Sequence, residues 1–185
     1  MPKLSVFLIV DSPLAEEKLH KVSLHQLALG EAIVFSNKYQ TSVTEVTFEN
    51  LLEEIKRSGA EIVVIHDALR PLVHLSQFER TYAGLGEFDA VRPTMAFTET
   101  IKSLDAQNRL DQTIDREKVR RISTPEIIRT AAIDFDGKIS TWLVPLVKSA
   151  KTTEVQADPE SIRINSAEEL RMLIALAQVA DPAHK

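Results

Sequence analysis

Residues 62–71 of this chain, IVVIHDALRP, join an uninterrupted apolar run to a group of charged residues. Val and Ile favour a strand, and a strand without alternating polar residues must be covered on both faces, as in a parallel sheet. Just upstream, residues 48–55 place Phe, Leu and Ile at helical spacing, and Gly59 suits a left-handed helix cap. A helix that leads directly into a buried strand predicts an α/β fold.

Two charged side chains follow this strand, at the end where open α/β sheets bind ligands. Asp67 has two possible roles: it holds a magnesium ion that bridges phosphates, or it only caps the turn that follows. Arg70 precedes Pro71, which favours an extended or turn conformation and leaves the guanidinium free for a phosphate or carboxylate. Local sequence alone favours an ordinary surface arginine, so both pairs of alternatives stay open.

Periodicity predicts the other elements: strands at residues 5–10, 32–35, 43–46 and 89–92, and helices at residues 18–29, 75–82 and 126–132. Pro125 suits the first turn of the last of these helices. Residues 101–114 alternate poorly and turn near Asn108, which predicts an exposed two-stranded arm outside the core. Ser166 and Glu169 form a capping box that predicts a C-terminal helix.

Composition limits the class of protein. The chain has 185 residues, 44% of them hydrophobic, which predicts a single domain over residues 1–185. A net charge of −5 argues against nucleic-acid or anionic-membrane partners, and the absence of cysteine excludes disulfides and thiolate metal sites. The apolar stretch in residues 1–10 is too short for a signal sequence and is followed by acidic residues, so we expect a cytoplasmic protein.

A group of basic residues lies after the predicted arm: Arg116, Lys118, Arg120 and Arg121. Such a group is usually a solvated face. Alternatively, arginines from this region join Arg70 in an anion site, which suits a small phosphorylated molecule better than a polymer.

Five motifs follow one another in the order of a known enzyme family. They are residues 64–71 (VIHDALRP), 98–102 (TETIK), 113–116 (TIDR), 123–125 (STP) and 161–165 (SIRIN). Together they resemble 2-C-methyl-D-erythritol 4-phosphate cytidylyltransferase, an isoprenoid-pathway enzyme that joins CTP to a sugar-alcohol phosphate and releases pyrophosphate. The resemblance implies a Rossmann-like nucleotide-diphospho-sugar transferase fold, with a mainly parallel sheet, helices on both faces and a protruding β-arm at about residues 98–118.

The resemblance also implies roles at the end of the central strand and on the arm. Asp67 would bind magnesium in an active enzyme, and Ala68 would contact the nucleotide. Arg70, Thr100 and Arg116 would bind the methylerythritol phosphate. Family members are homodimers in which the arm of one subunit completes the substrate site of the other.

Two catalytic residues follow from the resemblance. Arg163 stands where the family has a lysine that faces the reacting phosphates, so the positive charge is retained on a planar guanidinium. Lys21 would replace the lysine of the family's Pro-Lys pair, provided that the alignment contains a gap.

The main departure concerns CTP. Family members follow their first strand with a glycine-rich loop whose amides and cations cradle the triphosphate. Here residues 10–17 read VDSPLAEE, without glycine or arginine and with three carboxylates. Two hypotheses remain: a divergent cytidylyltransferase with impaired or lost activity, or a non-catalytic dimeric binding module that retains only the sugar-phosphate site.

Overall fold

The computed structural model describes residues 2–138 and 140–180, with side chains inside the last helix through residue 175. The strands and helices in chain order are β1 (Leu4–Ile9), η1 (Pro13–Glu16), β2 (Lys18–Leu19), β3 (Val22–Ser23), α1 (Leu24–Lys38), β4 (Val43–Val46), α2 (Leu51–Ser58), β5 (Ile62–Asp67), α3 (Leu75–Leu85), β6 (Ala90–Ala96), β7 (Ile101–Leu104), β8 (Leu110–Ile114), η2 (Arg116–Lys118), β9 (Arg120–Ile122), β10 (Glu126–Arg129), η3 (Thr130–Ala132), β11 (Thr152–Gln156) and α4 (Ala167–Ala180).

The centre of the molecule is a seven-stranded sheet in the order β11-β6-β10-β5-β1-β4, and β9 pairs with β6 off this path. β1 is parallel to both β4 and β5, and β11 is parallel to β6. β10 is antiparallel to β5 and β6, and β9 is antiparallel to β6. Because β10 is antiparallel to both of its neighbours, β1, β4, β5, β6 and β11 all run in the same direction, and the sheet is mainly parallel, as the sequence predicts.

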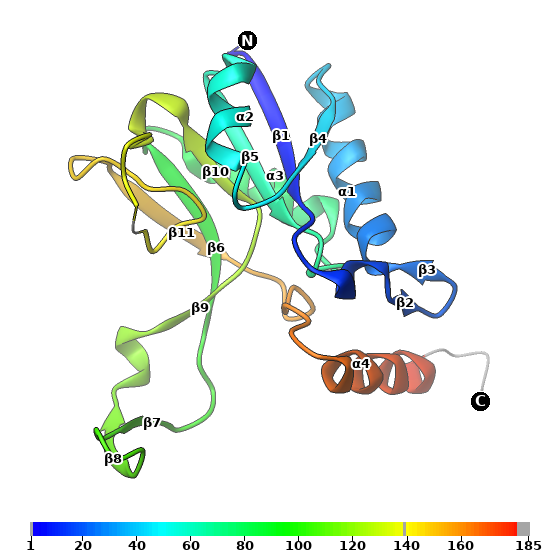
Figure 1. Ribbon diagram of the computed structural model, residues 1–185, viewed down its shortest axis with the longest axis vertical. Coiled ribbons are helices and arrows are strands. Elements are labelled where there is room, and N and C mark those ends of the chain that lie inside the picture. The colour runs from blue at the N-terminus through cyan, green and yellow to red at the C-terminus, as the bar shows by residue number, and fades with distance from the viewer. Residues whose placement is uncertain (1, 139, 181–185) are drawn as a thin grey trace.

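Helices cover both faces of this sheet (Figure 1). On one face, Ile65 of β5 belongs to an apolar cluster that contains Ile55 of α2. On the other face, Val64 belongs to a cluster with Phe35 of α1 and Phe78 of α3. Every residue of β5 is buried, which explains its continuous apolar sequence. The C-terminal helix α4 lies across the end of the sheet at which β1 and β5 finish (Figure 1).

Of the predicted elements near the N-terminus, the helix at residues 18–29 is correct only from residue 24, and the strand at residues 32–35 is wrong. Residues 18–23 form the β2–β3 hairpin, and α1 begins only after Ser23, whose side chain forms a capping box with Gln26. Residues 32–35 lie inside α1 and are not a strand. Ala28, Ala32 and Phe35 share the buried face of that helix, a spacing that a four-residue window does not reveal.

The predicted helix at residues 126–132 is also wrong. Residues 126–129 form β10, in which Ile127 pairs with Val64 of β5 and with Val91 of β6. Burial between two strands outweighs the local signal at Pro125, because pairing satisfies the backbone polar groups of a segment with no exposed face. The short strands β9 and β11 were not predicted, since their exposed residues carry little apolar periodicity.

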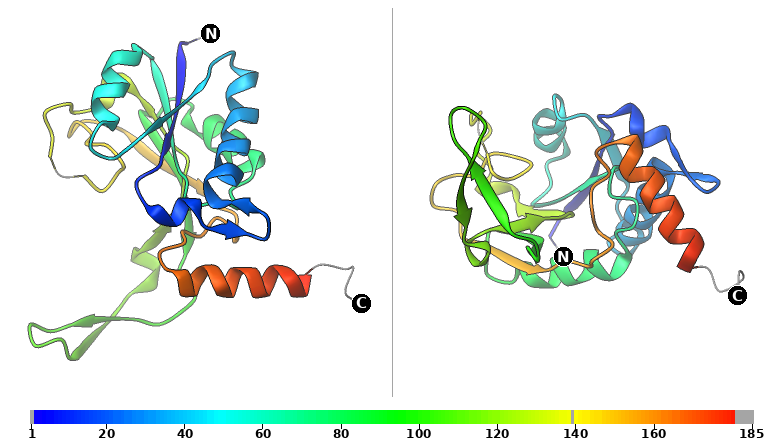
Figure 2. Two further views of the ribbon diagram at one scale, coloured as in Figure 1. Left: turned by 45° about the vertical axis from the view of Figure 1, so that its right-hand side comes forward. Right: turned by 90° about the horizontal axis from the view of Figure 1, so that it is seen from below.

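The predicted arm is present. β7 and β8 pair as a hairpin that turns at Asn108, which has a φ of 58°, and they extend far from the sheet (Figure 2). Leu104 and Leu110 face each other across this hairpin and are 58% and 76% exposed. At the other end of the chain, Glu169 donates its backbone N–H to the hydroxyl of Ser166, which confirms Ser166 as the cap of α4. The Glu169 side chain accepts the N–H of Asn165 and so does not complete the predicted capping box. No helix in the described part of the chain is long and apolar enough to cross a membrane.

Candidate anion site

A cavity of about 380 Å3, named here the arginine cavity, opens where β9 meets the turn after β5 and the segment before α4. Its lining consists of Arg70, Arg121, Ile122, Arg163 and Asn165. Three guanidiniums share this lining with no carboxylate. Such an arrangement is unfavourable for the empty protein and favourable for an anion, because each guanidinium offers a planar set of donors.

Asp67 ends β5 beside this cavity and has a partner on each carboxylate oxygen. Oδ1 accepts the backbone N–H of Leu69 at 2.9 Å, which is the turn-capping role. Oδ2 accepts Nε of Arg163 at 2.7 Å. Nη1 of Arg163 also donates to Asn165 at 2.8 Å, so the Arg163 side chain is held over the end of β5.

Arg70 is buried, with an exposed fraction of 8%, and is not a surface arginine. Its Nη1 donates to the carbonyl of Ser161 at 2.7 Å, and its Nη2 donates to the carbonyl of Ile122 at 3.0 Å. Its Nε atom is buried and has no hydrogen-bond partner among the described residues. Arg70 therefore links β9 to the segment before α4 through hydrogen bonds, and it lines the buried side of the arginine cavity.

The surroundings of Arg70 disfavour the charged form of its guanidinium. Burial lowers the pKa of Arg70 to about 10, the carboxylate of Asp67 opposes this shift, and the positive charges of Arg163 and Arg121 add to it. Arg70 remains protonated at neutral pH. An anion in the cavity would relieve the repulsion between these three positive charges.

Next to the cavity, buried hydrogen bonds fix the position of Ser123 and Thr124, which connect β9 to β10. Nδ1 of His66 lies 2.7 Å from the hydroxyl of Thr124, and Gln77 of α3 donates to the carbonyl of Thr124 at 2.6 Å. The hydroxyl of Ser123 donates to the carbonyl of Ser161, the same carbonyl that Arg70 contacts. Burial lowers the pKa of His66 to about 3, so His66 is a neutral structural residue at physiological pH.

A second cavity, of about 440 Å3, lies at the base of the arm and is lined by residues 97–102 and Arg121. We call it the arm-base cavity. It contains Thr100, and Arg121 is common to it and to the arginine cavity. Arg116 lies close by, where its Nη1 donates to the carbonyl of Thr98 at 3.0 Å, but it lines neither cavity. The structure thus brings Thr100 and Arg116 to the arm base, next to the arginine cavity.

The other two predicted residues, Lys21 and Ala68, line neither cavity. Lys21 is exposed in the turn of the β2–β3 hairpin and lines neither cavity. Ala68 is 1% exposed and packs in an apolar cluster with Ala15 and Leu24, and its N–H donates to the carbonyl of Ile9. Both the side chain and the N–H of Ala68 are therefore occupied by the protein.

In the segment after β1, several backbone N–H groups donate to acceptors within the same segment. Its residues form the short helix η1, in which the N–H of Leu14 donates to the side chain of Ser12. The N–H groups of Ala15 and Glu17 donate to carbonyls of the same segment. The side chains of Asp11, Glu16 and Glu17 are exposed. This loop offers carboxylates, and the amides of residues 14, 15 and 17 are already paired.

The described residues do not fit a metal ion held by the protein alone. They contain no group of three or more His, Asp or Glu side chains that could bind one. Asp67, the residue that the sequence assigns to magnesium, is paired with Arg163. A divalent cation would have to displace that guanidinium.

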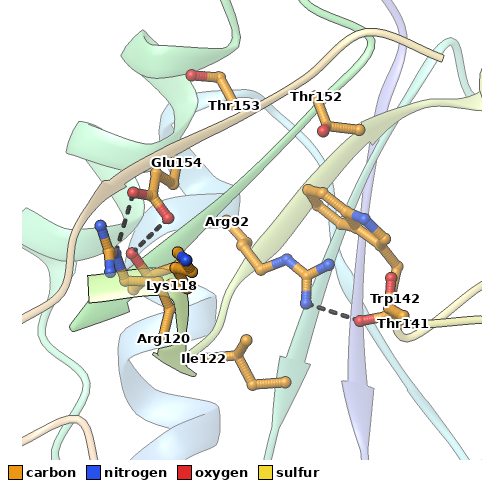
Figure 3. A pocket seen from close by; sticks show the side chains of 10 residues that line it. Arg92, Lys118, Arg120, Ile122, Thr141, Trp142, Thr152, Thr153 and Glu154 are labelled. Atoms are coloured by element: carbon orange, nitrogen blue, oxygen red, sulfur yellow. Dashed lines mark hydrogen bonds and ion pairs between the residues drawn. The ribbon is translucent and has the colours of Figure 1, made fainter. Parts of the chain in front are cut away.

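Another cavity, of about 720 Å3, lies beside β9 and is lined partly by Arg92, Arg120, Ile122 and Trp142 (Figure 3). The guanidinium of Arg92 stands 3.8 Å from the centroid of the Trp142 ring and donates to the carbonyl of Thr141. Arg92 also lies 3.4 Å from Glu126, a buried residue whose pKa burial raises to about 7.

Sequence reasoning missed this cluster because nothing in the local pattern links Arg92 with Trp142. These side chains lie 50 residues apart in the chain and meet only through the packing of the loop that follows η3. The contact between Arg70 and the carbonyls was missed for a similar reason. Backbone acceptors carry no sequence signal.

The sequence model of 2-C-methyl-D-erythritol 4-phosphate cytidylyltransferase matches residues 18–135. Among curated relatives, the bifunctional enzyme IspD/IspF of Rhodopseudomonas palustris strain HaA2 is 35% identical over 143 residues, which cover 69% of this chain and 36% of the relative. The enzyme of the same name from strain BisB18 is 37% identical over 78 residues, which cover 42% of this chain and 20% of the relative. The chain thus spans between 20% and 36% of the length of these relatives.

Solved structures share the fold. The crystal structure of 2-C-methyl-D-erythritol 4-phosphate cytidylyltransferase from Thermus thermophilus has a TM-score of 0.77 at 16% identity, covering 95% of this chain and 99% of that chain. Bifunctional IspDF from Campylobacter jejuni has a TM-score of 0.67 at 18% identity, covering 91% of this chain and 53% of that one. This likeness confirms the Rossmann-like nucleotidyltransferase fold that the sequence predicts.

Proposed function

Because the chain belongs to the 2-C-methyl-D-erythritol 4-phosphate cytidylyltransferase family, we propose that it retains the sugar-phosphate end of that family's reaction and has lost efficient transfer from CTP. In the family reaction, CTP and methylerythritol phosphate give CDP-methylerythritol and pyrophosphate. This chain would bind the methylerythritol phosphate at the arginine cavity and convert it slowly or not at all.

The observation that carries the proposal is the convergence of Arg70, Arg121 and Arg163 on one cavity without a carboxylate in its lining. Guanidiniums bind phosphate oxygens in pairs, and their bonds to a charged acceptor are stronger than neutral hydrogen bonds. A volume of about 380 Å3 suits a small phosphorylated molecule. Thr100 in the adjoining arm-base cavity would supply a hydroxyl to the carbon chain of the ligand.

The closed segment after β1 supports the loss of CTP transfer. Phosphoryl transfer depends mainly on positioning and on donors that neutralise the developing charge. Here the amides of Leu14, Ala15 and Glu17 already donate within the segment, and the exposed side chains of Asp11, Glu16 and Glu17 would repel a triphosphate.

The ion pair between Asp67 and Arg163 supports the same conclusion. In this proposal magnesium accompanies CTP and is not held by the empty protein, and it would compete with Arg163 for Asp67. In this proposal Arg163, which lines the arginine cavity, binds the sugar phosphate. We assign no step of the reaction to Lys21, whose hairpin turn carries it outside both cavities.

The internally paired segment after β1 also fits a second candidate function, a non-catalytic binding module that dimerises through the exposed arm. Leu104 and Leu110 form an apolar pair at the tip of a hairpin that stands away from the rest of the described chain (Figure 2). Such a pair is suited to burial against a second copy. The two candidates share the sugar-phosphate site and differ only in turnover.

Pyrophosphate release separates these candidates. The chain would be assayed with CTP, magnesium and methylerythritol phosphate, beside a family enzyme that has the glycine-rich loop. We expect a rate at least about 100-fold below that enzyme, since losing a single charge-stabilising donor already costs about this much. A comparable rate would contradict the loss of CTP transfer, and release at the background level would leave the binding module as the function.

A further inference from the structure

Arg121 differs from the other basic residues near the arm because its guanidinium has no partner among the described residues. In the described part of the chain it has no hydrogen bond and no ion pair through its side chain. Its neighbour Arg120 lies 3.4 Å from Glu154 and donates to the carbonyls of Glu117 and Val119. Side chains alternate along a strand, and β9 accordingly places Arg120 in the cavity that holds Trp142 and Arg121 in the arginine cavity.

The position of Arg121 is central to the site. It is the residue that lines both the arginine cavity and the arm-base cavity. It belongs to β9, which is paired with the core strand β6 through Met95, so its backbone is fixed by the sheet and not by the protruding hairpin. A ligand that fills both cavities would therefore contact Arg121.

The charges around the arginine cavity match an anion with two negative charges. Arg70, Arg121 and Arg163 contribute three positive charges, and Asp67 contributes one negative charge through its ion pair with Arg163. Two positive charges are therefore uncompensated. A dianion neutralises both, whereas a singly charged anion neutralises only one of them.

We infer that Arg121 is a phosphate-binding residue that makes the arginine cavity selective for phosphomonoester dianions over singly charged anions. This inference rests on the proposed function, because methylerythritol phosphate is a phosphomonoester. Without Arg121 the cavity retains a single uncompensated positive charge, and its preference shifts towards singly charged anions.

Two small probes test the selectivity. Methyl phosphate carries two negative charges at about pH 8 and dimethyl phosphate carries one, and calorimetry or NMR titration gives the dissociation constant of each. We expect Arg121→Gln to weaken methyl phosphate binding by about tenfold or more and dimethyl phosphate binding by less than about threefold. Arg121→Lys retains the charge without the planar fork and should recover part of the loss.

Arg120→Gln is the matched control, because it removes the same charge from the neighbouring residue on the other side of β9. It should change the affinity for either probe by less than about threefold. An equal loss of methyl phosphate binding in both variants would overturn the inference, since it would reflect overall charge. The unfolding midpoint of Arg121→Gln should equal that of the wild type, because the Arg121 side chain bonds to no described residue.

The outcomes separate this inference from the proposed function. If the wild type binds methyl phosphate through Arg121 but does not bind methylerythritol phosphate, the inference stands and the proposed function fails. If the wild type binds methylerythritol phosphate and Arg121→Gln binds it equally well, the proposed function stands and the inference fails.

Discussion

Nε of Arg163 donates to Oδ2 of Asp67 at 2.7 Å, and this ion pair joins the end of β5 to the segment before α4. The Asp67 side chain is 7% exposed and the Arg163 side chain 35%, so the pair is partly shielded from water. It occupies the carboxylate that would otherwise be available to a cation. It also lowers the positive charge that the arginine cavity presents to an anion.

Asp67→Asn should strengthen phosphate binding. The new side-chain amide keeps an oxygen that can accept the N–H of Leu69, while Arg163 loses its counter-charge and becomes available to the ligand. We expect the dissociation constant for methylerythritol phosphate, measured by calorimetry without magnesium, to fall by about threefold or more. Weaker binding in Asp67→Asn would show that the carboxylate itself contacts the ligand.

Replacing Arg70 with Lys should destabilise the fold. An ammonium cannot reach the carbonyls of both Ser161 and Ile122 in the geometry of the guanidinium, so a buried acceptor loses its partner. The free energy of unfolding, measured by urea denaturation, should fall by about 1–3 kcal/mol. Arg57→Lys on the exposed surface of α2 is the control. Equal stability of both variants would refute the fastening role of Arg70.

Two buried groups should give the stability of the protein an unusual dependence on pH. Burial raises the pKa of Glu126 from 4.5 to about 7, so the folded state holds an extra proton between these values and the stability falls as pH rises through this window. Burial lowers the pKa of His66 from 6.5 to about 3, so the unfolded state holds the extra proton and the stability rises with pH between 3 and 6.5. The two contributions oppose each other between pH 4.5 and 6.5.

Glu126→Gln separates these contributions. The amide that replaces the carboxyl group can still accept the N–H of Leu143 but does not titrate, so only the His66 contribution remains. Relative to wild type, the unfolding free energy of the variant should rise with pH between 4.5 and 6.5, by up to about 1.4 kcal/mol per pH unit. Chemical denaturation at several pH values measures this slope. Parallel curves for the two proteins would contradict the raised pKa of Glu126.

The arm tip should control dimerisation if the arm is the subunit contact. Changing both Leu104 and Leu110 to Ser removes the exposed apolar pair without touching the core. Sedimentation should then show a shift from dimer to monomer, with at least about tenfold weaker association. Val34→Ser, an exposed apolar position on α1, should leave the association unchanged. A monomeric wild type, or a dimer that survives both changes, would contradict this role.

Much of the fold could be predicted because its signals are local. The uniform apolar sequence of β5, the cap at Gly59 and the poor alternation of the arm each have one structural explanation. Residues 126–129 show the limit of this reasoning. They follow a proline that suits a helix, yet they form a central strand because of β5 and β6, whose positions the local window does not contain.

The candidate site was predictable in its residue types and less so in its contacts. Asp67, Arg70 and Arg163 do meet at the end of β5, as the family order of the motifs implies. The sequence cannot show that Arg70 is engaged by backbone carbonyls or that Arg163 is paired with Asp67. It also cannot distinguish Arg121 from Arg120, because only the pairing of β9 decides which side chain enters the cavity.

The central claim is that the sugar-phosphate site survives while the CTP site does not. Calorimetric titration of the wild-type chain with methylerythritol phosphate and, separately, with CTP and magnesium tests it most directly. We predict saturable binding of methylerythritol phosphate that is weakened about tenfold or more in Arg121→Gln, and no measurable binding of CTP at the same concentrations. Measurable binding of CTP, or no binding of methylerythritol phosphate, would contradict the claim.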